Sequence, residues 1–194
     1  MLILGSNLKN LPVMGLQTGG ELAITKQAVI DPRSLQIIAY RVEGPLLGGA
    51  ETYLRTADSR ELSDIGFIID SIDDFVGPDD VIRLREIINL HFQIDGIKVL
   101  DENNRALGKV IDYTLDVGSF TIQQLTVRRP LMKRFSDTEL LIHRSQITEI
   151  TNSSIIIHSE TEAPEHTATS TPGSYVNPFR KESPAAESID LGKS

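Results

Sequence analysis

An internal repeat is the feature of this 194-residue sequence that most restricts its possible folds. When the chain is shifted by 85 residues, residues 29–31 fall on residues 114–116, and a serine follows three residues later in both copies. After a length change of three residues the shift becomes 88, and residues 67–69 fall on residues 155–157. Such self-similarity indicates two copies of one structural unit. We therefore predict a duplication, with shared strand patterning as the alternative explanation of the apolar matches.

Each copy carries the pattern of short, half-buried β-strands. In the first copy Leu35, Ile37 and Ala39 occupy alternate positions, and the second copy repeats this arrangement. Alternation over about 4–7 residues, bounded by Asp, Gly, Asn and Pro, is typical of antiparallel strands. Residues 17–20 and 101–105 have the composition of turns, so we expect them to be equivalent hairpin loops. About five strands per copy favour a compact barrel, because closure removes exposed sheet edges.

The segment that joins the copies, residues 72–91, is acidic at its start and apolar later. Asp79 or Asp80 could cap a short helix there. The apolar face of that helix would hold Val81, Leu84 and Ile88. A strand over residues 81–84 that ends in a turn is the alternative, and the pattern alone does not choose between them.

The second copy carries a series of short motifs with a characteristic spacing. They are Gly96-Ile97-Lys98-Val99, Leu107-Gly108-Lys109-Val110, Asp116 and Phe120-Thr121-Ile122. In these motifs the chain resembles the PRC-barrel family. Its small β-barrel occurs in the cytoplasmic part of the photosynthetic reaction-centre H subunit and in the C-terminal half of the small-subunit ribosome maturation factor. The first copy follows the pattern more loosely, with Ala23 at the position of Gly108. The resemblance implies a fold and brings no catalytic residues with it.

The fold expected from these observations is mostly β. It consists of two tandem small PRC-like β-barrels joined by a short, partly helical linker and followed by a disordered C-terminal tail. The expected boundaries are residues 8–71 for the first domain, 72–91 for the linker, 92–159 for the second domain and 160–194 for the tail. The tail is predicted to be disordered because its Thr, Ser, Pro, Ala and Glu bury too little apolar surface. That surface cannot offset an ordering entropy of roughly 1–2 kcal/mol per residue.

One segment of the tail departs from this composition. Two aromatic residues, a proline and two cations stand together within residues 174–181. Disordered chains bind partners through short segments of this kind, in which aromatic side chains act as anchors. The candidate partner-binding residues are Tyr175, Asn177, Pro178, Phe179 and Arg180. The alternative is a spacer of unselected composition.

A second candidate site is a basic run in a chain whose formal net charge is -8. It follows a predicted strand, and its cations are Arg128, Arg129, Lys133 and Arg134. The planar guanidinium of arginine suits phosphate or carboxylate partners. A solvated loop that balances nearby acids is the alternative.

Several classes of site are excluded or disfavoured. The chain has no cysteine, which excludes disulfides, thiolate zinc sites and cysteine nucleophiles. The histidines His91, His143, His158 and His166 form no close ligand pair, and no phosphate-binding loop or nucleophile elbow is present. We therefore expect no metal, no cofactor and no catalytic residues. No run approaches the roughly 18–20 apolar residues that span a bilayer, so we expect a cytoplasmic protein with no membrane span.

These observations favour a non-enzymatic adaptor that binds another protein through the tandem barrels and the tail segment, with self-association as a further expectation. The negative net charge disfavours general affinity for nucleic acid or for anionic membranes. The alternative function is that of an accessory factor in ribosome maturation or RNA processing. In that role the basic run would contact ribosomal protein or rRNA phosphates.

Overall fold

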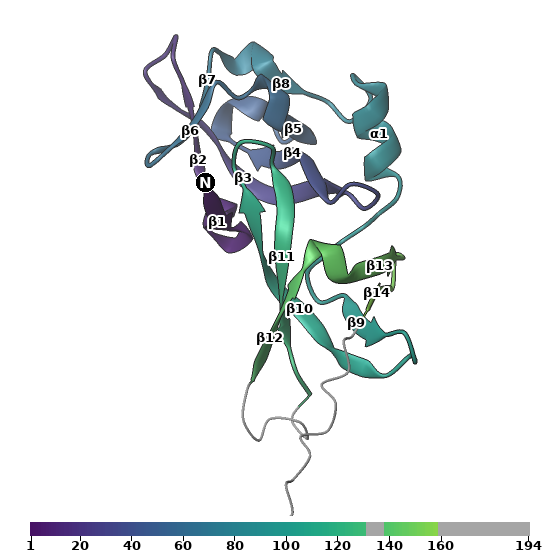
Figure 1. Ribbon diagram of the computed structural model, residues 1–194. Coiled ribbons are helices and arrows are strands. Elements are labelled where there is room, and N and C mark those ends of the chain that lie inside the picture. The colour runs from purple at the N-terminus through teal and green to yellow at the C-terminus, as the bar shows by residue number, and fades with distance from the viewer. Residues whose placement is uncertain (131–137, 159–194) are drawn as a thin grey trace, which may run out of the picture. The chain divides into compact units, whose positions relative to one another are not determined.

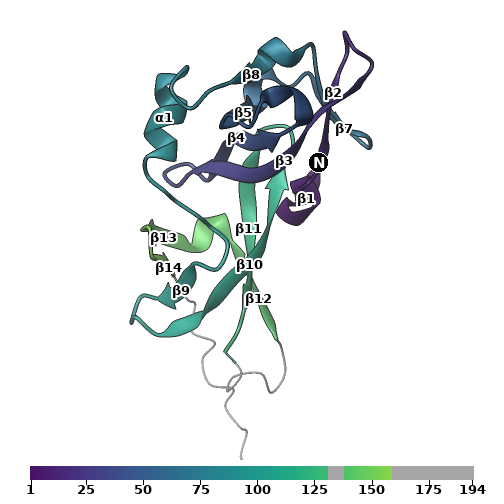
Figure 2. The same cartoon turned by 180° about the vertical axis from the view of Figure 1, so that it is seen from behind.

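The structure is a computed structural model that describes residues 1–130 and 138–158 (Figure 1, Figure 2). These residues are mostly β and contain a single α-helix, α1 (Ile82–Ile88), which confirms the expected fold class at this level. The first half contains β1 (Leu2–Leu4), β2 (Pro12–Gly15), β3 (Gly20–Asp31), β4 (Gln36–Glu43), β5 (Thr52–Arg55), β6 (Glu61–Ser63), β7 (Gly66–Ile69) and β8 (Phe75–Val76). The second half contains β9 (Lys98–Asp101), β10 (Ala106–Asp116), β11 (Thr121–Arg128), β12 (Glu139–His143), β13 (Ile147–Ile150) and β14 (Ser154–Ile157).

Both halves have the same strand order and the same strand directions. In the first half β2 pairs antiparallel with β3, β3 with β4 and β4 with β5, while β7 runs parallel to β2 and antiparallel to β6. In the second half these places are taken by β9, β10, β11, β12, β14 and β13. The shifts of 85 and 88 residues superimpose equivalent pairs, because Tyr40 lies opposite Leu54 and Leu125 lies opposite Ile142. The sequence repeat is therefore also a repeat of topology.

The two halves meet at the turns of the β3–β4 and β10–β11 hairpins. Each turn ends in a residue with positive φ, Leu35 (56°) in the first half and Phe120 (49°) at the equivalent position of the second. The carbonyl oxygens of these residues accept reciprocal hydrogen bonds. The backbone N–H of Ile37 donates to Phe120 at 2.8 Å, and that of Ile122 donates to Leu35 at 2.9 Å. This exchange joins the start of β4 to the start of β11.

Because β4 pairs with β11, the described strands form one 14-stranded sheet. Its main path runs from β13 to β6, and these two end strands do not pair with each other, so the sheet is open. The prediction of two tandem barrels is therefore not confirmed. The physical reason lies at the junction, where main-chain groups at the starts of β4 and β11 form hydrogen bonds between the halves.

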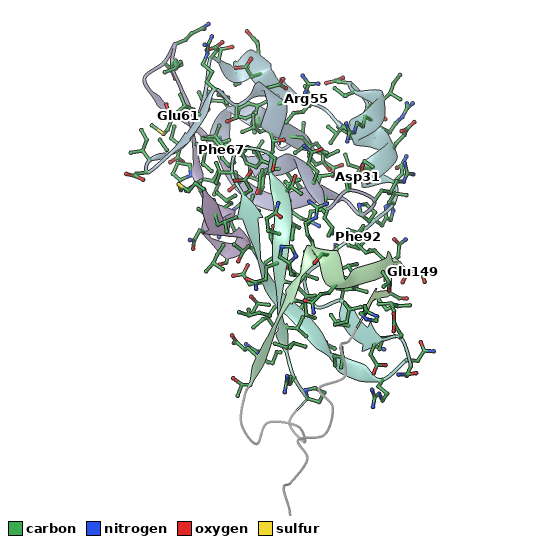
Figure 3. All side chains as sticks on the ribbon, in the orientation of Figure 1. Asp31, Arg55, Glu61, Phe67, Phe92 and Glu149 are labelled. Carbon is green, nitrogen blue, oxygen red and sulfur yellow. The ribbon has the colours of Figure 1, made fainter. Side chains whose placement is uncertain are left out.

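A single hydrophobic cluster extends through both halves. It includes Val13 and Phe67 from the first half and Val99 and Ile155 from the second. The ring of Phe120, from the β10–β11 turn, stacks on that of Phe67 with 6.0 Å between the centroids. Figure 3 shows Phe67 among the side chains enclosed by the first half. The core therefore continues across the junction.

The later part of the linker forms a helix, α1, and not a strand over residues 81–84, which decides between the two alternatives left open by the sequence. The residue before α1 is Val81, and no side chain caps the helix. The expected aspartate cap is wrong, because the Asp80 carboxylate accepts a hydrogen bond from the Gly77 N–H at 2.6 Å and closes a preceding turn. Leu84 is buried against Ala39 and Tyr53, so α1 covers the outer face of β4 and β5.

Candidate functional site

The basic run begins at the open end of the β11–β12 hairpin. Arg128 is the last residue of β11 and lies opposite Glu139, the first residue of β12. The Arg129 N–H donates to the Thr138 carbonyl at 3.0 Å, which extends the pairing by one step. The Arg128 side chain is exposed and that of Arg129 is half-buried. The other two predicted cations, Lys133 and Arg134, lie outside the described residues.

The predicted tail motif is not placed by the structure. Tyr175, Asn177, Pro178, Phe179 and Arg180 all lie outside the described residues. Their role in binding stays a prediction from sequence.

The hairpin carries Arg128 on the same face as an exposed leucine. Directly opposite residues of antiparallel strands share a face. The face, called the β12 face below, is formed by Arg128, Thr126 and Gln124 on β11 and by Glu139, Leu141 and His143 on β12. Leu141 is 58% exposed, whereas the five side chains around it are polar or charged. The β12 face therefore presents one apolar side chain within a polar surround.

The first half covers the equivalent face and edge. Tyr53, which a shift of 88 residues places on Leu141, is only 4% exposed beneath α1. The outer edge of β5 pairs with β8, where Tyr53 lies opposite Val76 and Leu54 opposite Phe75. In contrast, β12 pairs only with β11 as far as the described strands extend. The same shift places β8 on residues 163 and 164, outside the described residues.

Sequence reasoning found the basic run and missed Leu141. A residue-by-residue comparison of the two copies could have identified the β12 face. Positions beneath α1 in the first copy are apolar, namely Val29, Ile38 and Ala39. Their counterparts at a shift of 85 residues are Thr114, Gln123 and Gln124. Consistent with this change to polar residues, the described residues place no second α-helix over Leu141, which stays exposed.

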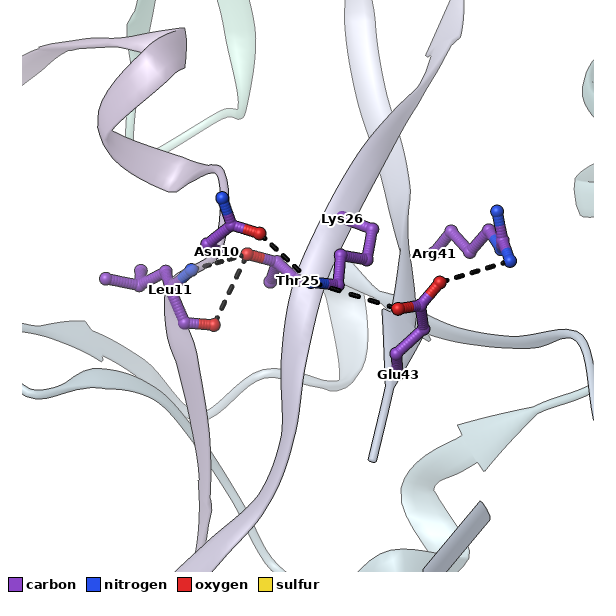
Figure 4. A network of polar contacts seen from close by, with 6 residues as sticks. All are labelled: Asn10, Leu11, Thr25, Lys26, Arg41 and Glu43. Atoms are coloured by element: carbon purple, nitrogen blue, oxygen red, sulfur yellow. Dashed lines mark hydrogen bonds and ion pairs between the residues drawn. The ribbon is translucent and has the colours of Figure 1, made fainter. Parts of the chain in front are cut away.

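A separate polar network fixes the rim of β3 and β4 (Figure 4). The buried Thr25 hydroxyl donates to the Leu8 carbonyl at 2.6 Å and accepts from the Leu11 N–H at 2.9 Å. The neighbouring Lys26 ammonium lies 3.8 Å from the Glu43 carboxylate, which also accepts from Arg41 at 3.2 Å. Two cations therefore share one carboxylate at this rim.

The described residues contain no group of three His, Asp or Glu side chains arranged to hold a metal ion. None of the helices in this part of the chain is long and apolar enough to cross a membrane. No protein-family model matches the chain, and no curated protein matches it, so the PRC-barrel resemblance stays a prediction.

Proposed function

We propose that this chain is a non-enzymatic binding protein that docks an extended segment of a partner protein along the edge of β12. The observation that supports this function is the contrast between the two halves. The edge of β5 is paired with β8 and its outer face is covered by α1, whereas β12 has no strand partner on its outer side among the described residues. An exposed strand edge is a template for another strand, because its backbone N–H and C=O groups point outward.

In this proposal the main chain of the partner pairs with β12 and its side chains contact the β12 face. Leu141 supplies the apolar anchor, since burying a leucine stabilises a complex by about 1.5–3 kcal/mol. Arg128 and Glu139, at one end of the face, select for charge in the partner segment. The tail residues Tyr175 to Arg180 form a second contact, which makes the chain an adaptor between two partners.

We also propose that the two halves are a tandem of PRC-like units, which their common topology and the motifs around Gly108 support. A cytoplasmic location is part of the same proposal. Gly108 also has a steric role, because a Cβ there would lie 2.2 Å from the carbonyl oxygen of Arg128.

The test compares two equally exposed leucines in the full-length chain. Leu141→Lys places a charge on the proposed edge, and Leu16→Lys places one on a residue of the first half that is also 58% exposed. In pull-downs from native extract, we expect Leu141→Lys to recover at least tenfold less of a partner than the parent chain does. Leu16→Lys should recover as much of it as the parent chain. Both variants should melt within a degree or two of the parent chain. Retention of every partner by Leu141→Lys would contradict the proposal.

A second copy of this chain is a competing occupant of the edge. Antiparallel self-pairing centred on Leu141 would set Glu139 of each copy opposite His143 of the other. Sedimentation of the purified chain separates the two cases. A dimer that Leu141→Lys dissociates would assign the edge to self-association, whereas a parent chain that sediments as a monomer leaves it to another protein.

The ribosome-associated function is supported by one observation, the exposed Arg128 at the hairpin end. If the basic run contacts rRNA phosphates, association with small subunits should weaken steeply with salt, by about one unit in the log–log slope per phosphate contact. Arg128→Ala should reduce that slope. Salt-independent association, or none, would reject this function.

A further inference from the structure

The first half contains an occupied version of the outer edge of β12, called the β12 edge below. The shift of 88 residues that relates the copies places β5 on residues 140–143 of β12. The outer edge of β5 is paired with β8, in which Val76 lies opposite Tyr53 and Phe75 lies opposite Leu54 (Figure 1). The sequence of β8 therefore shows what a strand needs in order to pair with an edge of this geometry.

The two residues of β8 fill opposite sides of the edge of β5. Phe75 packs against the main hydrophobic cluster, whereas Val76 packs against the smaller cluster of Tyr53 and Leu84 beneath α1. Successive side chains of a strand point to opposite faces of the sheet. A strand at this edge thus carries an aromatic residue toward the core and a β-branched residue toward the outer face.

The β12 edge has apolar residues on the same two sides. On the core side Ile142 is 0% exposed, and the half-buried Leu140 packs against the same cluster. On the outer face stands Leu141, which is 58% exposed. Residues directly opposite each other in antiparallel strands share a face. A residue opposite Leu141 would cover it, and the residues before and after that one would lie on the core side.

Backbone hydrogen bonds determine the phase and the length of the β12 edge. The Thr138 carbonyl accepts a hydrogen bond at 3.0 Å from the residue that follows β11. Because alternate residues of an antiparallel strand direct their backbone groups to opposite sides, those of Glu139 and Leu141 point away from β11. His143 has the same phase, but its N–H donates to the Gln146 side chain at 2.8 Å. The open edge is therefore short and ends before His143.

Charge at the other end of the edge selects for a basic residue. Glu139 is exposed on the outer face, and Arg128 lies opposite it on β11, one strand further from any docked segment. Opposite charges that face each other across two strands stabilise a sheet. The formal net charge of -8 also attracts basic segments from solution. A lysine or arginine opposite Glu139 is accordingly favoured.

We propose that the β12 edge binds a four-residue antiparallel segment of another protein with a defined order of residue types. An aromatic residue lies opposite Ile142, a β-branched residue opposite Leu141, an apolar residue opposite Leu140, and a lysine or arginine opposite Glu139. The β-branched residue exchanges backbone hydrogen bonds with Leu141. This inference rests on the docking at β12 proposed above and names the sequence class of the partner.

The first test is fluorescence anisotropy of a labelled peptide, Gly-Ser-Phe-Val-Val-Lys-Ser-Gly, titrated with the full-length chain. It should bind saturably and at least tenfold more tightly than a peptide with the same residues in scrambled order. Methylation of the first valine nitrogen should abolish binding, because that N–H donates to β12. Methylation of the second valine nitrogen is the matched control and should change the affinity less than threefold, since that N–H points away. Equal losses from the two methylations, or no binding of the parent peptide, would overturn the inference.

The second test exchanges the charges at the end of the edge. Glu139→Lys should weaken binding of the parent peptide at least threefold, and replacement of the peptide lysine by glutamate should restore it. Glu61→Lys is the control, since it makes the same change in net charge at an exposed residue of the first half. Equal weakening by the two variants would show that net charge alone is responsible and would refute the pairing.

Failure of this inference and failure of docking at β12 give different results. If a partner from native extract is lost with Leu141→Lys but the peptide does not bind, the docking stands and the sequence class is refuted. The chain itself repeats the aromatic–valine order of β8 at Tyr175 and Val176, outside the described residues. If the double variant Tyr175→Ser and Val176→Lys binds the peptide at least tenfold more tightly than the parent chain, the edge belongs to this segment and the assignment to another protein is overturned.

Discussion

At the scale of single residues, buried polar groups define how local turns are held. Asp101 ends β9 and is only 1% exposed. Its carboxylate accepts from the Asn103 N–H at 2.9 Å, from the Arg105 N–H at 2.8 Å and from the Arg105 guanidinium at 2.7 Å. These hydrogen bonds, those from the backbone of Arg105 foremost, hold the pKa of Asp101 below its ordinary value. The loop expected at residues 101–105 is therefore organised by its first residue.

Asp101→Asn should lower the melting temperature at pH 7 by about 3–12 °C, because losing one charge-assisted hydrogen bond costs about 1.5–3 kcal/mol and each kcal/mol shifts the midpoint of a chain of this size by about 2–4 °C. A carboxyl with a depressed pKa in the folded state stabilises the fold above its unfolded pKa, and that stability is lost as the pH falls through the folded pKa. The difference from the parent chain should therefore shrink as the pH falls below about 4. Melting curves by circular dichroism from pH 7 to pH 2.5 measure it.

The control is Asp64→Asn, a change in an exposed turn residue of the first half, which should melt like the parent chain at every pH. A gap between Asp101→Asn and the parent chain that persists unchanged at pH 2.5 would contradict the role assigned to the carboxylate.

At the scale of secondary-structure elements, α1 depends on its packing. A helix of seven residues is too short to be stable alone, because nucleation is costly and few hydrogen bonds follow. Leu84 supplies the contact that holds it, since this side chain is 2% exposed against Ala39 and Tyr53. The helix in turn covers one face of β4 and β5, which distinguishes the first half from the second.

Leu84→Ala should destabilise the chain by about 2–4 kcal/mol through lost burial and the cavity that remains. Hydrogen exchange of the α1 amides should accelerate more than that of β2 or β9, because the helix detaches before the sheet opens. Ile82→Ala is the control on the same helix, since Ile82 is 68% exposed. Equal effects of the two substitutions would show that α1 is not held by Leu84.

At the scale of the whole molecule, the shared core determines which parts can fold alone. Phe120 of the second half stacks on Phe67 of the first, and the hydrophobic cluster includes residues from both. Cutting the chain in the linker would expose this surface and break the reciprocal hydrogen bonds at Leu35 and Phe120. The halves have a common topology without having separate cores.

Fragments 1–91 and 92–194 made separately should therefore fail to melt cooperatively, and mixing them should restore a folded complex. Thermal melting of each fragment and of the mixture, followed by circular dichroism, checks this expectation. A fragment that melts cooperatively near the temperature of the intact chain would instead support two independent domains with the expected boundaries at 71 and 92.

Much of the fold could be predicted from sequence, because strand alternation and the repeat both follow from regular burial. The hairpin loops at residues 17–20 and 101–105, and the equivalence of Tyr40–Leu54 with Leu125–Ile142, are of this kind. The open sheet could not be predicted. It depends on which backbone groups of β4 and β11 meet, and apolar periodicity does not record that choice.

The candidate sites divide in the same way. Arg128 and Arg129 are visible in the sequence because charge in an acidic chain is conspicuous. Leu141 is not, because any strand holds leucines. Only the absence of a covering strand or helix over Leu141 among the described residues gives it significance.

The reciprocal junction has a consequence for stoichiometry. A pair of identical single-copy chains joined by the same two hydrogen bonds would be symmetric, so both outer edges would be covered or both would be open. Covalent linkage of two copies removes that constraint and lets each edge diverge on its own. Here β8 closes the edge of the first copy, whereas the described residues leave that of the second unpaired. A partner that adds a strand to β12 would accordingly bind once per chain.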